Sequence, residues 1–168
     1  ALVNLQGKFS EAESLYKKLL AIQEAALGPE HHLSIAGSLT NLVILLKDQG
    51  KYSEAGPLLR RSLAIREATL GPEHPQVDDS LNNLDGSLVD QGKHSEAKAL
   101  SMRSLAIREA ALDPDHPHVA LSLNNLASLL MDRGKYPKTE PLLRRSLAIR
   151  EATLGPEHPQ VAGSLNNL

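Results

Sequence analysis

The hexapeptide Leu-Ala-Ile-Arg-Glu-Ala begins at Leu63 and returns at Leu105 and Leu147, a step of 42 residues each time. The dipeptide Gly-Lys and the string Ser-Leu-Asn-Asn-Leu recur with the same step. A fixed period of this size indicates stacked copies of one supersecondary unit rather than one globular core. Such copies bury one face against their neighbours and leave a long surface for a partner.

Each copy has the pattern of two helices joined by a tight turn. In the copy at residues 75–112, Pro75 occupies a first helical turn, where a missing N–H is harmless, and Gly92 supplies a left-handed helix end. We expect Ser95 to cap the second helix, and that helix to end at Asp113, where the sister copies have glycine. Asp tolerates the left-handed conformation of such a helix end better than most side chains, but less well than Gly. Nothing alternates with period two, so no strands are expected. The first helix carries one apolar stripe at helical spacing: Val77, Leu81, Leu84 and Leu88.

The copies are not all alike. Residues 57–77 are identical to residues 141–161, which indicates duplication of a two-repeat block. The copy between them carries three polar replacements, at Asp85, His94 and Ser101, where its sisters have small or large apolar residues. Drift in a redundant array explains them, and so does a functional hinge or small polar pocket. A buried Asp85 without a partner would have a raised pKa or admit water.

The repeated unit resembles the tetratricopeptide repeat. The string Leu-Gly-Pro-Glu-His-Pro, from Leu70 and from Leu154, further resembles the 42-residue repeats of kinesin light chains and their relatives. The resemblance covers the whole chain and implies an all-α solenoid of helix hairpins, stacked in a right-handed superhelix. Thr139 departs from the pattern, since Ala stands there in the other copies. The family's anchor positions in the copy at 117–158 are filled by Leu123, Leu126, Ala127, Gly134, Tyr136, Leu143 and Ser146.

We therefore predict a single array over residues 1–168. It comprises a partial first repeat at 1–32, full repeats at about 33–74, 75–116 and 117–158, and a partial last helix at 159–168. Terminal repeats normally present a polar outer face. Leu165 and Leu168 leave an apolar edge instead, so either the native chain continues or this edge meets another copy.

In tetratricopeptide arrays the first helix of each repeat lines a concave groove, and the resemblance places paired amides there. An Asn side chain offers one acceptor and two donors, so a ladder of them suits an extended peptide of unspecified sequence. An Asn within a helix can instead bond only its own neighbours, an alternative that is stronger for the first member of each pair. The predicted groove residues are Asn41, Asn82, Asn83, Asn124, Asn125, Asn167, Ser128, Asp90 and Asp132.

The predicted groove is poor in basic residues. Lys47 is the one cation at the matching positions, whereas Asp48, Asp90 and Asp132 repeat along one edge. Relatives that clamp a terminal carboxylate use Lys and Arg there, so we expect a neutral to mildly basic peptide. The second helices carry the basic residues, and we interpret these as a solvated outer face, with a second contact surface as the alternative. They are Lys17, Lys18, Arg60, Arg61, Arg103, Arg144 and Arg145, with the Arg-Glu pairs at Arg66, Arg108 and Arg150.

Composition and spacing argue against several other classes of protein. A net charge of -2 and a pI near 6.4 disfavour nucleic acid binding. No apolar run approaches the roughly 18 residues of a membrane span, no secretory leader is visible, and the chain has no Cys, so we predict a cytoplasmic protein without a cofactor. One His recurs in each repeat, on the order of 20 Å from the next, too far to share a metal ion. We expect His31, His74, His116 and His158 to hydrogen-bond the loop before each first helix.

Three functional hypotheses follow. The first is a non-catalytic scaffold that binds a protein or peptide in the groove. The second is a structural array that associates end to end through its open terminal repeats, and light scattering against concentration separates it from the first. The third is the sensor region of a larger signalling ATPase. No catalytic constellation stands out, so enzyme activity is not expected.

Overall fold

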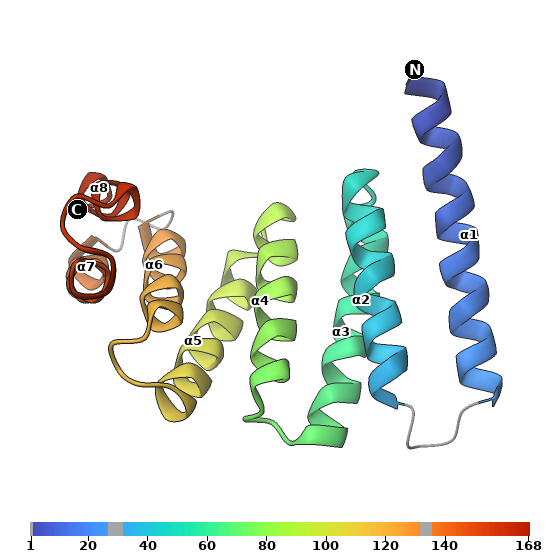
Figure 1. The fold of residues 1–168 in the computed structure, drawn as a ribbon, viewed down its shortest axis with the longest axis horizontal. Helices are drawn as coiled ribbons and strands as arrows, with labels where there is room; N and C mark the ends of the chain where they lie inside the picture. Colours follow the sequence, from blue (N-terminus) through green and yellow to red (C-terminus); the bar gives the residue numbers. More distant parts are fainter. Residues whose placement is uncertain (1, 27–31, 132–135) are drawn as a thin grey trace. The chain divides into compact units, whose positions relative to one another are not determined.

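The computed structural model describes residues 2–26, 32–131 and 136–168 of the chain. These residues form eight helices and no strand, which confirms the predicted all-α class (Figure 1). The helices are α1 (Leu2–Ala26), α2 (His32–Asp48), α3 (Tyr52–Leu70), α4 (Pro75–Asp90), α5 (His94–Ala111), α6 (Pro117–Met131), α7 (Tyr136–Leu154) and α8 (Pro159–Asn166).

The chain divides into two compact units, which we call the N-terminal unit (Ala1–Gly92) and the C-terminal unit (Lys93–Leu168). Each unit is described by itself. The N-terminal unit consists of the hairpin α2–α3, with α1 packed on α2 and α4 packed on α3. The C-terminal unit repeats this plan with the hairpin α6–α7, flanked by α5 and α8.

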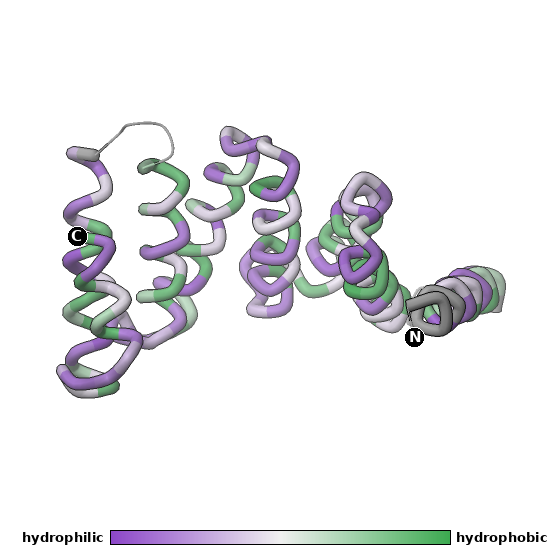
Figure 2. The backbone as a smooth tube through the Cα atoms, turned by 90° about the horizontal axis from the view of Figure 1, so that it is seen from above, coloured by the Kyte–Doolittle hydropathy of each residue, from purple (hydrophilic) through white to green (hydrophobic). Residues whose placement is uncertain are grey.

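Both units are held together by the predicted apolar stripes. Leu39, Leu42 and Leu46 of α2 are at most 2% exposed, and so are the four stripe residues of α4. In the C-terminal unit, Ile149 of α7 packs on the buried stripe of α6. Figure 2 shows hydrophobic and hydrophilic residues alternating along the helices, as expected of elements that bury one side. Full burial of each such side chain contributes roughly 1.5–3 kcal/mol.

The recurring histidines cap the first helices. The Nδ1 atoms of His74, His116 and His158 each accept a hydrogen bond of 3.2 Å from the backbone N–H two residues later. A proline follows each His at the start of its helix. The predicted structural role of these histidines is confirmed, while His31 lies outside the described residues.

Of the predicted helix ends, the one at Gly92 is confirmed and those at Ser95 and Asp113 are wrong. Gly92 does adopt the left-handed conformation, with φ of 71°. However, α5 begins at His94, so Ser95 lies inside the helix, and the N-cap position belongs to Lys93, which makes no side-chain capping bond. Asp113 does not take the left-handed place of glycine, since every described residue with positive φ is a glycine. Instead its Oδ1 accepts from the backbone N–H of Asp115 at 2.9 Å, a local turn that Asp side chains favour.

The first helix is longer than the repeat pattern suggests. Gly50 and Lys51 separate α2 from α3, but the matching Gly7 and Lys8 lie within the continuous helix α1. In the first repeat, therefore, no turn separates the first helix from the second. Within the part of the chain described, no helix has an apolar stretch long enough to cross a membrane.

Candidate functional site

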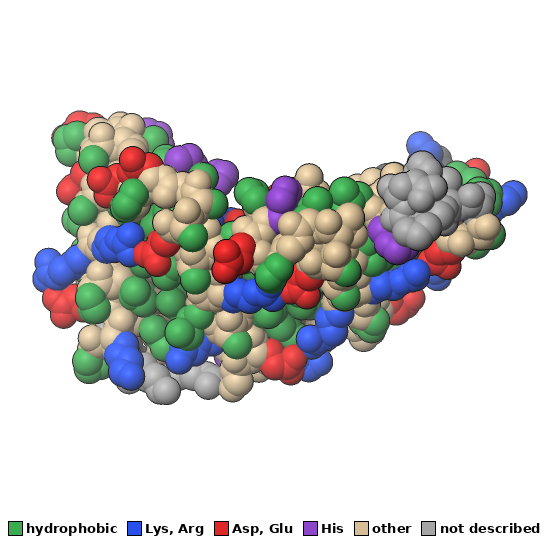
Figure 3. Space-filling model, turned by 90° about the horizontal axis from the view of Figure 1, so that it is seen from below, with side chains coloured by type: hydrophobic (Ala, Val, Ile, Leu, Met, Phe, Trp, Pro, Cys, Tyr) green, Lys and Arg blue, Asp and Glu red, His purple; other side chains and the backbone are tan. Residues whose placement is uncertain are grey.

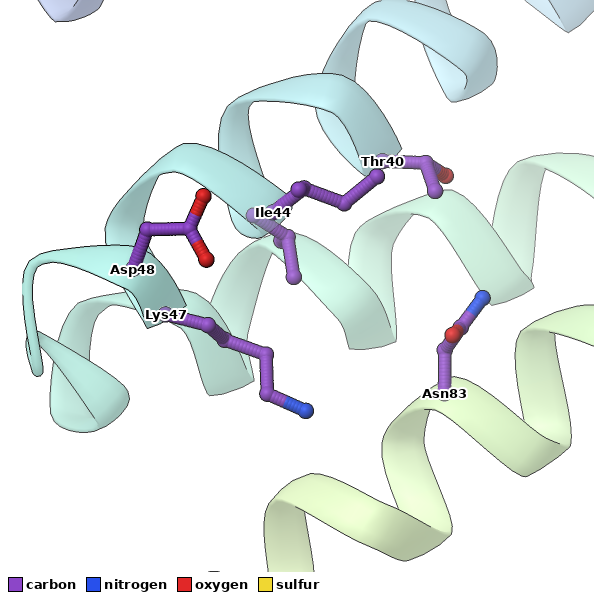
Figure 4. A pocket seen from close by; sticks show the side chains of 6 residues that line it. Thr40, Ile44, Lys47, Asp48 and Asn83 are labelled. Atoms are coloured by element: carbon purple, nitrogen blue, oxygen red, sulfur yellow. The ribbon is translucent and has the colours of Figure 1, made fainter.

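A hollow of about 250 Å³ lies between α2 and α4, the first helices of successive repeats in the N-terminal unit. From α2, Ile44 and Lys47 extend toward the side on which α4 lies, and Asn83 extends from α4 toward α2, whereas Asp48 points away (Figure 4). Both walls thus come from first helices, the elements that the resemblance to tetratricopeptide arrays places in the groove. The lining residues are Thr40, Val43, Ile44, Lys47, Asp48 and Asn83.

The side chains of the hollow differ in exposure and in the hydrogen bonds that they make within the protein. The Thr40 hydroxyl donates to the Ala36 carbonyl oxygen at 2.9 Å and lies 3.2 Å from the Ser62 hydroxyl, so it helps to join α2 to α3. Ile44 is 56% exposed, an unusual state for so large an apolar side chain on a helix with a buried stripe. Asn83 is also exposed. Ile44 and Asn83 are therefore the groups best placed to contact a ligand.

The charge around the hollow is acidic. Helices α2 and α4 together carry one Lys, no Arg and five Asp. The cation, Lys47, lies with its Nζ 3.7 Å from Oδ2 of Asp90. Asp48 and Asp79 are exposed on the same two helices. Asp78 and Asp85 are buried, so the exposed carboxylates of the two helices are Asp48, Asp79 and Asp90, against the half-buried Lys47.

The two amides of the pair in α4 lie in different surroundings. Asn82 donates from Nδ2 to the carbonyl oxygen of Asp78 at 2.9 Å and to its Oδ1 at 3.0 Å, so it bonds its own helix. The next residue, Asn83, points into the hollow between α2 and α4. Asn41 is exposed on α2, next to the lining residue Thr40.

Of the predicted groove residues that the structure describes in the C-terminal unit, only Asn167 lines a hollow. Asn124 and Asn125 of α6 are half-buried, and Ser128 is exposed with its hydroxyl donating to the Asn124 carbonyl oxygen at 3.1 Å. Asp132 lies outside the described residues. A smaller hollow of about 170 Å³ contains Asn167; its other lining residues are Met131, Thr139, Glu140, Leu143 and Leu168.

The arginine of the repeated hexapeptide is not part of a solvated outer face, which corrects the sequence interpretation. Arg108 is 7% exposed, and its Nη1 donates to the His118 carbonyl oxygen at 2.9 Å and to Ser122 Oγ at 2.8 Å. It thereby ties α5 to α6, the first helix of the next repeat. The guanidinium is buried there because it is hydrogen-bonded.

The same bond recurs at two other junctions, α3–α4 and α7–α8. Arg66 donates to Ser80 Oγ at 2.6 Å and to Ser62 Oγ at 2.9 Å, and burial lowers the pKa of Arg66, an effect that the charge of Asp79 opposes. Arg150 donates to Ser164 Oγ at 2.5 Å. A sequence signal was present, since every such Arg has a Ser four residues before it and another fourteen residues after it.

Most other cations of the second helices are exposed, as predicted. Arg144 bonds Glu140 within α7, and Arg145 bonds Glu109 of α5. Figure 3 shows Lys and Arg side chains interspersed with Asp and Glu on the face that it displays, without one large basic patch. Among the residues with described positions, no three His or carboxylate side chains gather closely enough to hold a metal ion.

Comparison with known proteins agrees with this geometry. The family model of the tetratricopeptide repeat matches residues 2–33, 35–76, 79–118 and 119–160. Two crystal structures of kinesin light chain-like, nearly identical TPR-like repeats from Podosopora anserina are 31% and 32% identical, with TM-scores of 0.82 and 0.83, over 98% of this chain and 77% of theirs. BtubC (BKLC) from P. vanneervenii is 23% identical, with a TM-score of 0.76, over 91% of this chain and 60% of its own. No curated protein sequence matches. The resemblance inferred from the sequence is confirmed.

Proposed function

Because the chain belongs to the tetratricopeptide repeat family, whose repeats are generally scaffolds for protein–protein interaction, we propose that it is a non-catalytic scaffold that binds a protein or peptide segment along its first helices. The observation that carries this proposal is the hollow between α2 and α4. It combines an exposed apolar side chain, an amide and an acidic surround in one place. The apolar side chain can contact a peptide side chain, the amide can bond the peptide backbone, and the carboxylates can attract basic groups.

The ligand is an extended segment held by its backbone. The Asn83 side chain can donate to a peptide carbonyl and accept from a peptide N–H at once, without reading the neighbouring side chain. Ile44 offers an aliphatic contact beside it. Asn125, at the position of α6 that corresponds to Asn83, makes the same contact in the C-terminal unit. Binding by backbone amides gives affinity, and specificity then depends on apolar contact and charge.

The ligand is neutral to mildly basic. The positive charge of Lys47 is balanced by Asp90 at 3.7 Å, so it is not available to hold a carboxylate in the way that a lone lysine would be. Asp48 and Asp79 are further exposed carboxylates on these helices, although Asp48 points away from the hollow and Asp79 interacts with Arg66. Complementary potentials speed encounter and suppress wrong partners, so an acidic segment would be repelled.

Substitution of single amides tests the groove. Asn83→Ala removes the proposed peptide contact, and we expect affinity for the captured partner to fall about tenfold, the equivalent of roughly 1.4 kcal/mol. The matched control is Asn82→Ala, the adjacent amide, which bonds its own helix and should leave affinity unchanged. The measurement is a pull-down with the wild type and with Asn83→Ala/Asn125→Ala, followed by titration of the recovered partner.

Two results would refute the groove. Equal recovery of partners by the wild type and by the double variant would show that these amides do not bind the ligand. A peptide array that returned mainly Asp- and Glu-rich sequences would refute the charge argument.

A further inference from the structure

Ile44 is an exposed apolar residue that the fold does not require. A step of 42 residues carries Ile44 onto Gly86 of α4, and a second step carries it onto Ser128 of α6. Both of those residues lie in helices that bury their apolar stripe as α2 does. A first helix therefore forms and packs without a large side chain at this position. Single exposed apolar residues are common on protein surfaces, but this one lines a hollow, which indicates a contact with a ligand.

The lining of the hollow around Ile44 is largely carbon. Val43, which is 3% exposed, and Ile44 contribute aliphatic side chains to it. The hydroxyl of Thr40 already donates to the Ala36 carbonyl oxygen at 2.9 Å. Lys47 extends from α2 toward the side on which α4 lies, so its carbon stem adds to the lining (Figure 4). The hollow thus offers a ligand mainly aliphatic contacts on the side of α2.

The charged groups at the rim do not favour a charged occupant. The ammonium group of Lys47 lies 3.7 Å from Oδ2 of Asp90, so each of these charges already has an opposite charge beside it. The carboxylate of Asp48 points away from the hollow. A charged side chain that entered would lose water and would have to compete with the existing ion pair. An apolar side chain meets neither cost.

The size of the hollow and the opposite wall define the ligand further. A dry cavity of about 150 Å³ holds a benzene ring, so a hollow of about 250 Å³ has room for one side chain as large as Leu, Met or Phe. Asn83 extends from α4 toward this space, where its amide can bond the backbone of a peptide. Successive side chains of an extended peptide point to opposite sides, so when one enters the hollow its two neighbours point away from it.

We propose that the hollow between α2 and α4 binds one large apolar side chain of the peptide that the scaffold holds. This inference rests on the proposed function and names the residue class that the groove selects. Asn83 bonds the backbone of any sequence, whereas Ile44 and Val43 contact only a side chain that reaches into the hollow. The protein therefore selects a segment by one apolar residue and leaves the adjoining positions unspecified.

A peptide library tests this selection directly. The probes are short synthetic peptides in which Gly and Ser surround one randomised central position, and the peptides retained by the immobilised protein are sequenced. We expect Leu, Ile, Met and Phe at the central position to be retained about tenfold better than Ser, Asp or Lys, because part of the side chain leaves water. Titration of the protein with the Leu and Ser peptides, each with a fluorescent label, measures the same ratio.

Three variants assign the preference to the hollow. Ile44→Ser installs the residue that α6 carries at the same repeat position, so it should fold normally, as circular dichroism can verify, and should remove most of the preference for an apolar residue. Met102→Ser removes a side chain of similar exposure, 52%, from the second helix α5 and should keep the preference. Asn83→Ala should weaken all the peptides alike, because it acts on their backbone.

The possible failures separate this inference from the groove itself. Equal retention of all central residues, with binding that still depends on Asn83, would overturn the apolar selection and leave the groove in place. Selection of charged central residues, or an apolar preference that survives Ile44→Ser, would overturn it as well. Retention of no peptide, or binding that Asn83→Ala does not weaken, would refute the groove and the selection together.

Discussion

The buried arginine at the junction of α5 and α6 gives the sharpest prediction about stability. Arg108→Met keeps most of the apolar stem but removes the guanidinium that donates to the His118 carbonyl oxygen and to Ser122 Oγ. Ser122 is buried, so its hydroxyl loses a partner that water cannot readily replace. Hydrogen bonds to charged groups contribute roughly 1.5–3 kcal/mol each, but the variant also avoids the cost of burying a charge. We therefore expect a loss of about 1.5–3 kcal/mol for the whole substitution.

Urea unfolding followed by circular dichroism measures this loss. With a slope of about 2 kcal/mol per molar urea, the midpoint should fall by roughly 0.8–1.5 M. Repeats contact only their neighbours, so loss of one junction should also broaden the transition. The matched control is Arg144→Met, which removes an exposed pair with Glu140 worth about 0.3–0.5 kcal/mol. An Arg108→Met midpoint no lower than that of the control would show that the junction bond contributes nothing.

Three smaller effects follow from the same structure. Lys17 and Lys51 donate to Glu13 at 2.6 and 2.7 Å and lower its pKa from 4.5 to about 2, so its ion pairs stabilise the fold fully above pH 4.5 and are lost as pH falls toward 2. In urea midpoints measured against pH, Glu13→Gln should reduce the fall in stability between pH 4.5 and 2. An unchanged fall would contradict the assignment. His74→Ala removes the N-cap of α4 and should lower the free energy of unfolding by about 1 kcal/mol, whereas His74→Asn should restore part of it. Equal melting temperatures of the wild type and both variants would exclude the cap. Gly92→Ala forces a Cβ into the left-handed region and should cost roughly 1–2 kcal/mol in the same melting assay, so a neutral result would mean that the turn rearranges.

Helix positions and core faces could be predicted from the sequence because they depend on local spacing. Leu39, Leu42 and Leu46 repeat with the period of a helix, and the structure buries them. Pro75 and Gly92 likewise act through their own backbone preferences, and both occupy the expected places. Features of this kind need no knowledge of which helix lies next to which.

The wrong predictions concern contacts between helices or competition between local preferences. Arg108 and Glu109 look like a solvated pair along one helix, yet the Arg bonds a serine of the following helix, which helical periodicity alone does not reveal. The pairing of Lys47 with Asp90 likewise depends on how α2 and α4 lie together. Asp113 could take the left-handed place of glycine or bond its own backbone, and the second conformation avoids steric strain at Cβ.

The candidate groove shows the same division. The doubled Asn motif drew attention to the first helices, but it could not distinguish Asn82, which bonds Asp78, from Asn83, which faces α2. That difference arises from one step of about 100° around the helix. The spacing of apolar residues could not predict the exposure of Ile44 either; only the resemblance to the family places it at a groove position.

The arginine–serine bond between successive repeats has a consequence for how such a gene can change length. Arg66, Arg108 and Arg150 each donate to a serine fourteen residues further along the chain, so the junctions α3–α4, α5–α6 and α7–α8 have the same donor and the same acceptor, whereas α1 has Gln23 at the corresponding position. Unequal crossing-over that removes or adds 42 residues among these three junctions therefore restores a matched arginine and serine. The protein could therefore gain or lose whole repeats there while keeping the same hydrogen bond between successive repeats.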